Sequence, residues 1–323
     1  MFFFYLCLDY QCTRLNMELI SVIIPNYNYA RFLKQRIDSV LNQTYTNIEV
    51  IILDDCSSDN SKETIEQYRN NDRVTHIVYN EQNSGTTFKQ WRKGFELAKG
   101  DFIWIAEADD YAAPTLLEEL VSRMAADKDI KVGIVNSHWV LPDKTFINPD
   151  YTIPDEVRIY NGKDFVRQHL LKENYIYNAS MAVFRRDALS RLSDEYMSFR
   201  SCGDKLFWKE LSRQGKVLFV CKPLNYFRIH DSKVTTRSIS SGLLFSEENR
   251  FYHMNIQDGT ITNGHTRADV IKYFLQYIEN VRPQLQSEDV YLHCRALWLN
   301  ECDYRNSQLP FIFRVQCFLK PIV

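Results

Sequence analysis

The chain has 323 residues, of which 45% are hydrophobic and 25% are charged, so it is long enough and apolar enough to fold around a large core. Its formal net charge is −2 and it contains no long run of lysine or arginine, which argues against nucleic acid as a partner. The eight cysteines include no Cys-x-x-Cys pair, and a chain of this size does not depend on disulfides, so we expect a reducing, cytoplasmic setting.

The first residues do not share the pattern of the rest of the chain. They begin with about eight apolar residues that no basic stretch precedes, and Asp9 and Arg14 follow soon after. This run is too short to span a membrane and lacks the parts of a signal peptide. Because Met17 stands directly before the first expected strand, we expect residues 1–16 to be a leader that is not native. A short anchor at the membrane surface is the alternative.

Residues 19–110 alternate between strand and helix patterns. The run Ile20–Pro25 is rich in β-branched residues, as is typical of a parallel strand covered on both faces. Repeated strand and helix units of this length predict an α/β fold with a mostly parallel central sheet, flanking helices and right-handed crossovers. The expected strands are 20–25, 48–53, 74–79 and 102–106, and the expected helices are 30–43, 60–68 and 87–98.

Two of these helices carry boundary signals. Asn60, with Glu63 three residues later, resembles a capping box, and Gly100 is placed to end the third helix as a C-cap. Further along, an irregular proline-rich stretch is expected at 142–155, and beyond about residue 240 the spacing becomes helical. The remaining expected elements are helices at 116–126, 162–172 and 204–214, a strand at 132–135, an apolar segment at 176–184 and a closing strand pair at 217–220 and 224–230.

Carboxylates stand at the ends of two expected strands. Asp54 and Asp55 follow one strand and open a helix, where aspartate is also an ordinary turn or N-cap residue. Their functional interpretation is that a carboxylate at a strand's carboxyl end accepts hydrogen bonds from a nucleobase or ribose. Glu107, Asp109 and Asp110 end another strand and repel one another unless water or a cation offsets their charge. Mg²⁺ or Mn²⁺ suits such oxygen ligands, and a solvated acidic turn is the alternative.

Four segments occur in an order that characterises one family. They are SVIIPNYN (21–28), IILDDCSSDNS (51–61), NSG (83–85) and AKGDFIWIAEADD (98–110). With these segments in this order, residues from about 19 to 235 resemble a family 2 glycosyltransferase with the GT-A fold. The last 80 or so residues lie outside the resemblance.

The resemblance implies a nucleotide pocket. It places Pro25 and Asn26 in that pocket and has one of Asp54 and Asp55 contact the base. Basic residues on the helix after the NSG segment are candidates for phosphate contacts, although such residues usually face solvent. The expected nucleotide contacts are Pro25, Asn26, Asn28, Asp54, Asp55, Asn83, Gly85, Lys89, Arg92, Glu107 and Ala108.

The resemblance also implies a bound Mn²⁺ or Mg²⁺. Residues 107–109 occupy the family's Asp-x-Asp position, with Asp109 as the expected ligand. The first acidic residue here is Glu107, whose longer side chain leaves open whether it binds the metal directly, through water, or binds ribose instead. His230 matches a histidine that often ends the family's last core strand beside the metal or the diphosphate, and a structural role is the alternative. Arg228 lies two residues away, on the same face of the strand.

The family commonly has a catalytic base within a Glu-Asp pair that opens a helix. Asp204 takes the place of that base, while Gly203 replaces the glutamate. An aspartate that only favours the helix dipole is the alternative. A glycine beside it favours the functional interpretation, because it permits close approach of a ligand. Further acceptor or sugar contacts are expected from Asp110, Asn178, Ser180, Gly203 and Arg228.

The resemblance therefore implies a metal-dependent, inverting glycosyltransferase that moves a sugar from a UDP, dTDP or GDP donor to a glycan or lipid-linked acceptor in bacterial surface-polysaccharide synthesis. Asp204 would take the acceptor proton, and no covalent intermediate would form. A nicotinamide oxidoreductase is disfavoured because no Gly-x-Gly-x-x-Gly turn follows the first strand, and the usual hydrolase, zinc and NTPase motifs are absent. A non-catalytic carbohydrate- or sugar-nucleotide-binding protein is the alternative, given Glu107 and Gly203.

These expectations divide the chain into a leader (1–16), a GT-A domain (17–235) and a mainly helical extension (236–323). The segment 311–323 mixes aromatic residues with basic ones, so peripheral contact with the inner face of a membrane is one interpretation and a final helix packed on the core is the other. The sequence does not specify the sugar, the acceptor or the oligomeric state.

Overall fold

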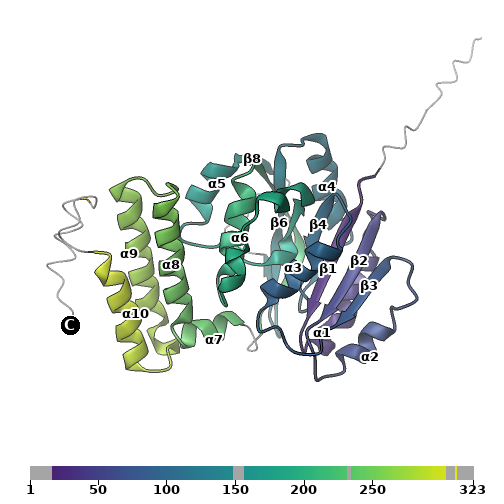
Figure 1. Cartoon of the computed structure of the whole chain (residues 1–323), viewed down its shortest axis with the longest axis horizontal. Helices are drawn as coiled ribbons and strands as arrows, with labels where there is room; N and C mark the ends of the chain where they lie inside the picture. The colour runs from purple at the N-terminus through teal and green to yellow at the C-terminus, as the bar shows by residue number, and fades with distance from the viewer. Residues whose placement is uncertain (1–16, 148–155, 231–233, 303–309, 311–323) are drawn as a thin grey trace, which may run out of the picture.

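A large sheet crosses the molecule, and a bundle of helices from the C-terminal part of the chain stands beside it (Figure 1). The sheet has ten strands. The expected leader at 1–16 and the aromatic segment at 311–323 lie outside the residues that the structure describes. The computed structural model describes residues 17–147, 156–230, 234–302 and 310.

The first four strands pair in parallel, as predicted, and their order in the sheet is β3-β2-β1-β4. β1, β2 and β4 are buried along their whole length, which explains why their sequences show no polar alternation. The register aligns Asn26 with Asp54, so the carboxyl ends of these strands meet at one edge. The bounds are β1 (Ile20–Asn26), β2 (Ile48–Asp54), β3 (Val74–Tyr79) and β4 (Phe102–Ile105).

The connecting helices fix where a ligand can bind. The chain moves outward from β1 to β2 to β3 and then returns past β1 to β4. Right-handed crossovers therefore place α1 and α2 on one face of the sheet and α3 on the other. Ligands of open α/β sheets bind outside the strand ends where this direction changes, here between β1 and β4. The bounds are α1 (Ala30–Leu41), α2 (Ser61–Glu66), α3 (Thr87–Leu97) and α4 (Leu116–Ala126).

The second half of the sheet is mixed. β9 (Ala182–Arg185) runs antiparallel between β4 and β6 (Ile130–Val140), and β6 pairs in parallel with the long β10 (Lys216–Arg228). The two-residue β5 (Tyr111–Ala112) pairs antiparallel with the end of β10. Because β5 directly follows the acidic turn, it attaches that turn to the far half of the sheet.

The predicted closing pair of strands was wrong, because both segments belong to β10. The ladder with β6 shifts its register between Val220 and Pro223 and again between Pro223 and Asn225. Proline cannot donate a ladder hydrogen bond, and a bulge at this point lets the strand continue past it. The residues that suggested a turn therefore mark an irregularity within one strand.

The predicted capping box was wrong as well. The side chain of Asn60 makes no capping bond. Asp59 Oδ1 accepts instead from the backbone N–H of Ser61 at 3.0 Å and from its hydroxyl at 2.5 Å. Asp59 Oδ2 also accepts from the N–H of Ala30 at 2.9 Å, so one carboxylate serves the starts of α1 and α2. The tertiary contact with Ala30 thus determines that Asp59, and not Asn60, caps α2.

Gly100 does not act as a C-cap. α3 is followed by an extended Ala98, and a Cβ at Gly100 would lie 2.5 Å from the backbone nitrogen of Ser21 and 2.7 Å from the carbonyl oxygen of Leu19. The N–H of Gly100 donates to Ser21 Oγ at 2.8 Å. A glycine is required because the loop before β4 passes too close to the start of β1 for any side chain.

The later elements complete the sheet's cover. α6 (Gly203–Ser212) lies against α3, with the Phe207 ring centroid 5.3 Å from that of Trp91 and 5.7 Å from that of Phe95. The segment expected at 176–184 forms a 3₁₀ turn and then enters β9. The other elements are α5 (Gly162–His169), β7 (Thr145–Ile147), β8 (Val157–Asn161) and the 3₁₀ turns η2 (Ala179–Met181), η3 (Arg186–Arg191), η4 (Asp194–Ser198) and η5 (Arg282–Gln284).

The C-terminal part is helical, as predicted, while its boundary at residue 236 stays a prediction. Its helices enclose a second hydrophobic core, in which the rings of Phe274 and Trp298 stack 4.3 Å apart. None of the helices that the structure describes is long and apolar enough to cross a membrane. The bounds are α7 (Val234–Ser240), α8 (Leu243–Gln257), α9 (Gly264–Val281) and α10 (Glu288–Asn300).

The N-cap of α9 permits a simple stability test. Asn263 Oδ1 accepts from the N–H of Thr266 at 2.9 Å. Replacing Asn263 with alanine is expected to lower the free energy of unfolding by about 1 kcal/mol, because a helix N–H loses its partner. Denaturant titration followed by circular dichroism measures the change. Asn263→Asp keeps an acceptor and serves as the control; an equal loss in that variant would contradict the capping role.

Candidate active site

Asn26 and Asp54 form one part of the site, at the ends of β1 and β2. Asn26 Nδ2 donates to Asp54 Oδ1 at 2.7 Å, and the N–H of Ser57 donates to Asp54 Oδ2 at 3.0 Å. Asn26 and Asp54 are only 2% and 4% exposed, and Pro25 is buried before them in β1. Both oxygens of Asp54 are therefore engaged by protein donors, which shape the loop after β2.

Asp55 organises the next loop. Its Oδ1 accepts from the side chains of Asn80 and Gln90 at 2.6 and 2.8 Å and from the N–H of Ser84 at 2.9 Å. Its Oδ2 accepts from the Ser84 hydroxyl at 2.8 Å. These bonds hold the segment after β3 against the end of β2. Contact of Asp54 or Asp55 with a base stays a prediction.

Two turns lie beside the carboxyl ends of β1 and β2. Asn83 Nδ2 donates to the carbonyl oxygen of Asp55 at 3.1 Å, and its Oδ1 accepts from the N–H of Gly85 at 2.8 Å. Gly85 has a φ of 84°, which favours glycine, and a Cβ there would meet no atom within 4 Å. Asn28 is also left-handed, with a φ of 58°, and its Oδ1 accepts from the N–H of Ser58 at 2.8 Å. Gly85 thus presents bare backbone to open space.

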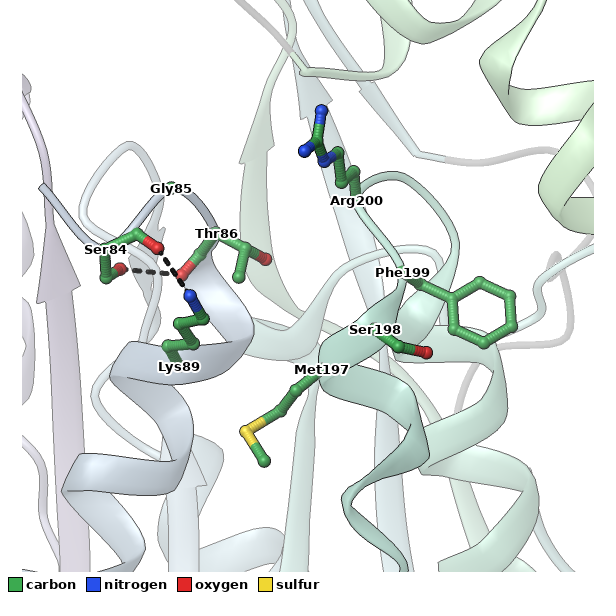
Figure 2. Close-up of a pocket in the computed structure, with 8 residues that line it drawn as sticks. All are labelled: Ser84, Gly85, Thr86, Lys89, Met197, Ser198, Phe199 and Arg200. Atoms are coloured by element: carbon green, nitrogen blue, oxygen red, sulfur yellow. Dashed lines mark hydrogen bonds between the residues drawn. The ribbon is translucent and has the colours of Figure 1, made fainter.

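A pocket opens beside Gly85 at the start of α3 (Figure 2). Its volume is about 460 Å³, and the end of η4 with the residues after it forms the opposite wall. Lys89 Nζ donates to the carbonyl oxygen of Ser84 at 3.0 Å. Arg92 instead pairs with Asp194 at 3.1 Å and is not among the residues that line the pocket. The lining residues are Ser84, Gly85, Thr86, Lys89, Met197, Ser198, Phe199 and Arg200.

The acidic turn after β4 places its carboxylates in different environments. Trp91 Nε1 donates to Glu107 Oε1 at 2.9 Å. Burial, reinforced by the negative charge of Asp109, raises the pKa of Glu107 to about 8. Ala108 is buried beside it. Glu107 is thus held by a protein donor, which agrees with its departure from the family's aspartate.

Asp109 and His230 meet at the carboxyl end of β4. Asp109 Oδ2 and His230 Nε2 are 3.0 Å apart, and the two side chains are 16% and 11% exposed. Tyr29 and Phe32 flank the imidazole, with ring centroids 5.7 and 5.5 Å away. A carboxylate oxygen and an imidazole nitrogen therefore lie together at the edge where ligands bind, although 121 positions separate the residues in the sequence.

Arg228 ties β10 to the acidic turn. Its Nη1 donates to the carbonyl oxygen of Asp109 at 2.6 Å, its Nη2 donates to Gln35, and its backbone N–H donates to Asp110 Oδ1 at 3.1 Å. The guanidinium lies 4.6 Å from the ring of Tyr111, and burial lowers its pKa. The side chain thus holds the turn against the end of β10, and its contact with a sugar or acceptor stays a prediction.

Three expected sugar or acceptor contacts form a buried network instead of an open surface. Asp110 Oδ2 accepts from Asn178 Nδ2 at 2.6 Å and from Ser180 Oγ at 3.0 Å. Asp110 and Ser180 are 0% exposed, and Asn178 is 9% exposed. In this arrangement these side chains connect the acidic turn to η2. Their contact with a sugar would need a change of conformation and stays a prediction.

Sequence reasoning missed Arg36, which lies fully buried beneath the acidic turn. Its Nε donates to the carbonyl oxygen of Glu107 at 2.8 Å, and its Nη2 donates to Ser180 Oγ at 2.9 Å. Burial lowers its pKa to about 10, so it remains a cation at neutral pH. A signal was available, because Arg36 falls on the buried stripe of α1 with Leu33 and Ile37.

Asp204 lies in the first turn of α6. Asn174 Nδ2 donates to Asp204 Oδ2 at 2.8 Å. Burial raises the pKa of Asp204 from 3.8 to about 7. The residues shortly before it line the same pocket as Lys89. The segment that leads to the expected base therefore forms the wall of the pocket opposite Gly85.

Gly203 serves packing within the protein. A Cβ there would lie 2.3 Å from the carbonyl oxygen of Tyr196 and 2.7 Å from the ring of Phe88. The space that the glycine leaves is thus occupied by the chain itself, which does not support the interpretation that it admits a ligand. A glutamate at this position would collide with the same atoms.

A family model described as Glycosyl transferase family 2 matches residues 21–193, more than half of the chain. The chain belongs to this family. The match confirms the resemblance drawn from the four sequence segments and includes the strand-end loops and the acidic turn. Asp204 and His230 lie beyond the matched residues.

Proteins similar to this family 2 chain include two bacterial glycosyltransferases. The uncharacterized glycosyltransferase YibD of Escherichia coli strain K12 is 30% identical over 185 residues, which is 55% of this chain and 52% of YibD. TuaG of Bacillus subtilis strain 168, named as a teichuronic acid biosynthesis glycosyltransferase, is 36% identical over 106 residues, which is 33% of this chain and 42% of TuaG. The matches thus span about half or less of these relatives.

A solved structure confirms the GT-A fold of this family 2 chain. The crystal structure of S. aureus TarS 1-349 in complex with UDP is similar with a TM-score of 0.66, at 17% sequence identity. The similarity covers 93% of this chain and 86% of the TarS chain, so the helical extension takes part in it. The same TarS fragment has also been solved in complex with UDP-GlcNAc.

Proposed function

We propose that this chain transfers a sugar from a nucleoside diphosphate to an acceptor hydroxyl, with inversion at the anomeric carbon. The observation that carries the proposal is the pair of Asp109 and His230, 3.0 Å apart at the switch point of a family 2 fold. The engaged amides and carboxylates at the ends of β1 and β2 provide the rigid floor that a nucleotide site needs. The UDP and UDP-GlcNAc complexes of TarS support a sugar nucleotide as donor. The proposed donor is a UDP, dTDP or GDP sugar.

The donor set fits Mn²⁺ or Mg²⁺. Among the residues that the structure describes, no three His, Cys, Asp or Glu side chains are grouped to hold a metal by themselves. Asp109 and His230 supply one oxygen and one nitrogen, and these ions typically take one or two protein carboxylates and complete their shell with water and substrate phosphates. A bound metal would offset the charge that builds on the departing diphosphate.

The acceptor half rests on Asp204. A half-buried aspartate with a pKa near 7 is matched to proton transfer at neutral pH, because it is ionised often enough to act and basic enough to take a proton. Asn174 donates to its Oδ2, and backbone N–H groups of Asp204 and Lys205 also favour the ionised carboxylate. In the proposed reaction this carboxylate receives the proton of the acceptor hydroxyl as that oxygen attacks the sugar. The proton moves to Asp204 while the bond between sugar and diphosphate breaks.

One of the relatives supports the proposed class of acceptor. TuaG is named for teichuronic acid biosynthesis, which supports a glycan or lipid-linked acceptor and a role in bacterial surface-polysaccharide synthesis. A protein that binds a sugar nucleotide without turning it over is the second candidate, favoured by Gly203 at the family's glutamate position. Release of nucleoside diphosphate in the absence of acceptor separates the two, since only a transferase hydrolyses its donor.

A thermal-shift panel tests the donor site. In the presence of Mn²⁺, one class of UDP-, dTDP- or GDP-sugar is expected to raise the melting temperature, since a ligand at 100 times its Kd adds about 2.7 kcal/mol to stability. Asp109→Asn should weaken this shift, whereas Asp164→Asn, on the surface of α5, should leave it unchanged. A panel without any shift would contradict the proposed donor site.

A further inference from the structure

Glu247, on α8 of the C-terminal extension, reaches the loop that precedes α6. Its Oε1 accepts from the backbone N–H of Arg200 at 2.7 Å, and its Oε2 accepts from those of Ser201 and Cys202 at 2.8 and 3.0 Å. Glu247 itself is only 8% exposed. Three consecutive backbone donors thus converge on one buried carboxylate that comes from another part of the chain.

The residues at the start of α6 provide no N-cap side chain of their own. The N-terminus of a helix leaves backbone N–H groups without intrahelical partners, and an N-cap side chain usually accepts from one of them. Cys202, the N-cap of α6, makes no such bond, and Gly203 has no side chain. Glu247 accepts from the three N–H groups just before the helix, and its negative charge lies at the end where the helix dipole favours an anion.

Neighbouring residues of α8 hold the same segment. Glu248 Oε2 accepts from Lys205 Nζ at 2.7 Å in a pair whose side chains are 8% and 1% exposed. The guanidinium of Arg250 lies 4.3 Å from the ring of Phe199, which lines the pocket. The residues on both sides of the proposed base are therefore attached to the extension and not only to the sheet.

We propose that Glu247 is a positioning residue that fixes the loop 200–202 and thereby the place of the Asp204 carboxylate, which makes the C-terminal extension part of the transfer machinery. The inference rests on the proposed role of Asp204 as the base. Glu247 is proposed to act on Asp204 through the backbone of residues 200–202, without contacting the substrate. Without it, the loop can shift, and a misplacement of about 1 Å at a reacting group can lower a rate about 100-fold.

A change in solvation of Asp204 gives a second, independent signature. Its raised pKa is due chiefly to burial; Glu248 raises it further and Lys205 lowers it. Backbone N–H groups of Asp204 and Lys205 also lower it, and the uncharged Asn174 donates to Oδ2. Loosening the loop admits water, so the pKa moves down toward its ordinary value and the acidic limb of the kcat profile moves to lower pH.

The test uses Glu247→Gln and Glu247→Ala in the full chain. The assay is release of nucleoside diphosphate from the sugar nucleotide that the panel selects. We expect kcat to fall about 10-fold in the glutamine variant, which keeps one acceptor oxygen, and about 100-fold in the alanine variant, with the donor KM unchanged. The acidic limb should move to lower pH in both variants. Amides 200–204 should exchange faster with deuterium, and Glu247→Asp should restore part of kcat.

Glu301→Gln is the matched control, because Glu301 lies in the same extension, where it accepts from Asn249 and His253. It should keep the kcat and the pH profile of the parent. A parent-like kcat in both Glu247 variants, or a lower kcat with an unmoved acidic limb and unchanged exchange, would overturn the inference. If the alanine variant does not fold, the glutamine and aspartate variants decide. Normal turnover in Asp204→Asn would instead contradict the proposed role of Asp204 as the base.

Discussion

Replacing Asp204 with asparagine is expected to lower turnover by at least about 100-fold, the usual scale for a positioned general base, while sugar-nucleotide binding stays intact. Asparagine preserves the shape of the side chain and its place beside Asn174, but it cannot take a proton from the acceptor hydroxyl. Steady-state release of nucleoside diphosphate measures the loss, and the thermal shift with donor measures binding. Turnover near that of the parent would remove Asp204 from the mechanism.

The pH dependence of the parent follows from the same group. Because the base acts only when ionised, kcat should fall as the pH drops through about 7. The free energy of unfolding should change with pH in the opposite direction. Because the folded state holds this proton more tightly than the unfolded chain, ionisation of Asp204 lowers the stability of the fold as the pH rises from about 4 toward 7. Asp204→Asn should therefore be at least as stable as the parent at pH 8.

A first-turn aspartate elsewhere provides the control for the helix-dipole alternative. Asp164 occupies the first turn of α5 and is exposed, whereas Asp204 occupies the first turn of α6 and is half-buried. Asp164→Asn removes a charge from a helix start without touching the site, so its turnover should match the parent. A loss of similar size in Asp164→Asn would mean that the dipole, and not proton transfer, explains the effect.

Removal of divalent metal is expected to abolish transfer, and Mn²⁺ or Mg²⁺ should restore it. The proposed ligands Asp109 and His230 supply two donors, so the ion would depend on the diphosphate for further ligands and should exchange readily with a chelator. Activity is measured after EDTA treatment and again after addition of each metal. In Asp109→Asn, the concentration of Mn²⁺ needed for half-maximal activity should rise by at least about 10-fold.

The opposite end of the same strand supplies the control for the metal site. Asp101 precedes β4, and its Oδ2 accepts from the N–H of Leu19, far along the strand from the acidic turn. Asp101→Asn should leave the metal requirement unchanged. Full activity of the parent in EDTA would rule out the proposed metal, and an equal change in both variants would assign the effect to stability.

Prediction from the sequence succeeded where the structure depends on local pattern. β1, β2 and β4 are continuous apolar runs, and the pattern identifies them because a strand covered on both faces has no polar alternation. Prediction failed where a contact between segments far apart in the sequence determines the local structure. Asp59 and not Asn60 caps α2 because Asp59 also binds the start of α1, and β10 passes Pro223 because β6 supports it on one side.

The site shows the same division. The sequence placed Asp109 at a strand end by itself, whereas His230 was matched to it through the family resemblance and not through any spacing. Arg36 lies on an apolar stripe that was used only to predict a helix, and the cation it places beneath the acidic turn appears once α1 packs on the sheet. Glu247 carries no local signal, because its partners are backbone groups.

The sequence by itself determined the parallel strands, the carboxylates at their ends and the helical extension, because each is encoded in the periodicity or the neighbours of a short segment. Only the tertiary structure decided which of these carboxylates are buried, which one meets a histidine, and that a carboxylate of α8 binds the loop before α6. Burial and hydrogen bonds to the backbone depend on segments far apart in the chain, and a linear pattern does not record which of them will meet.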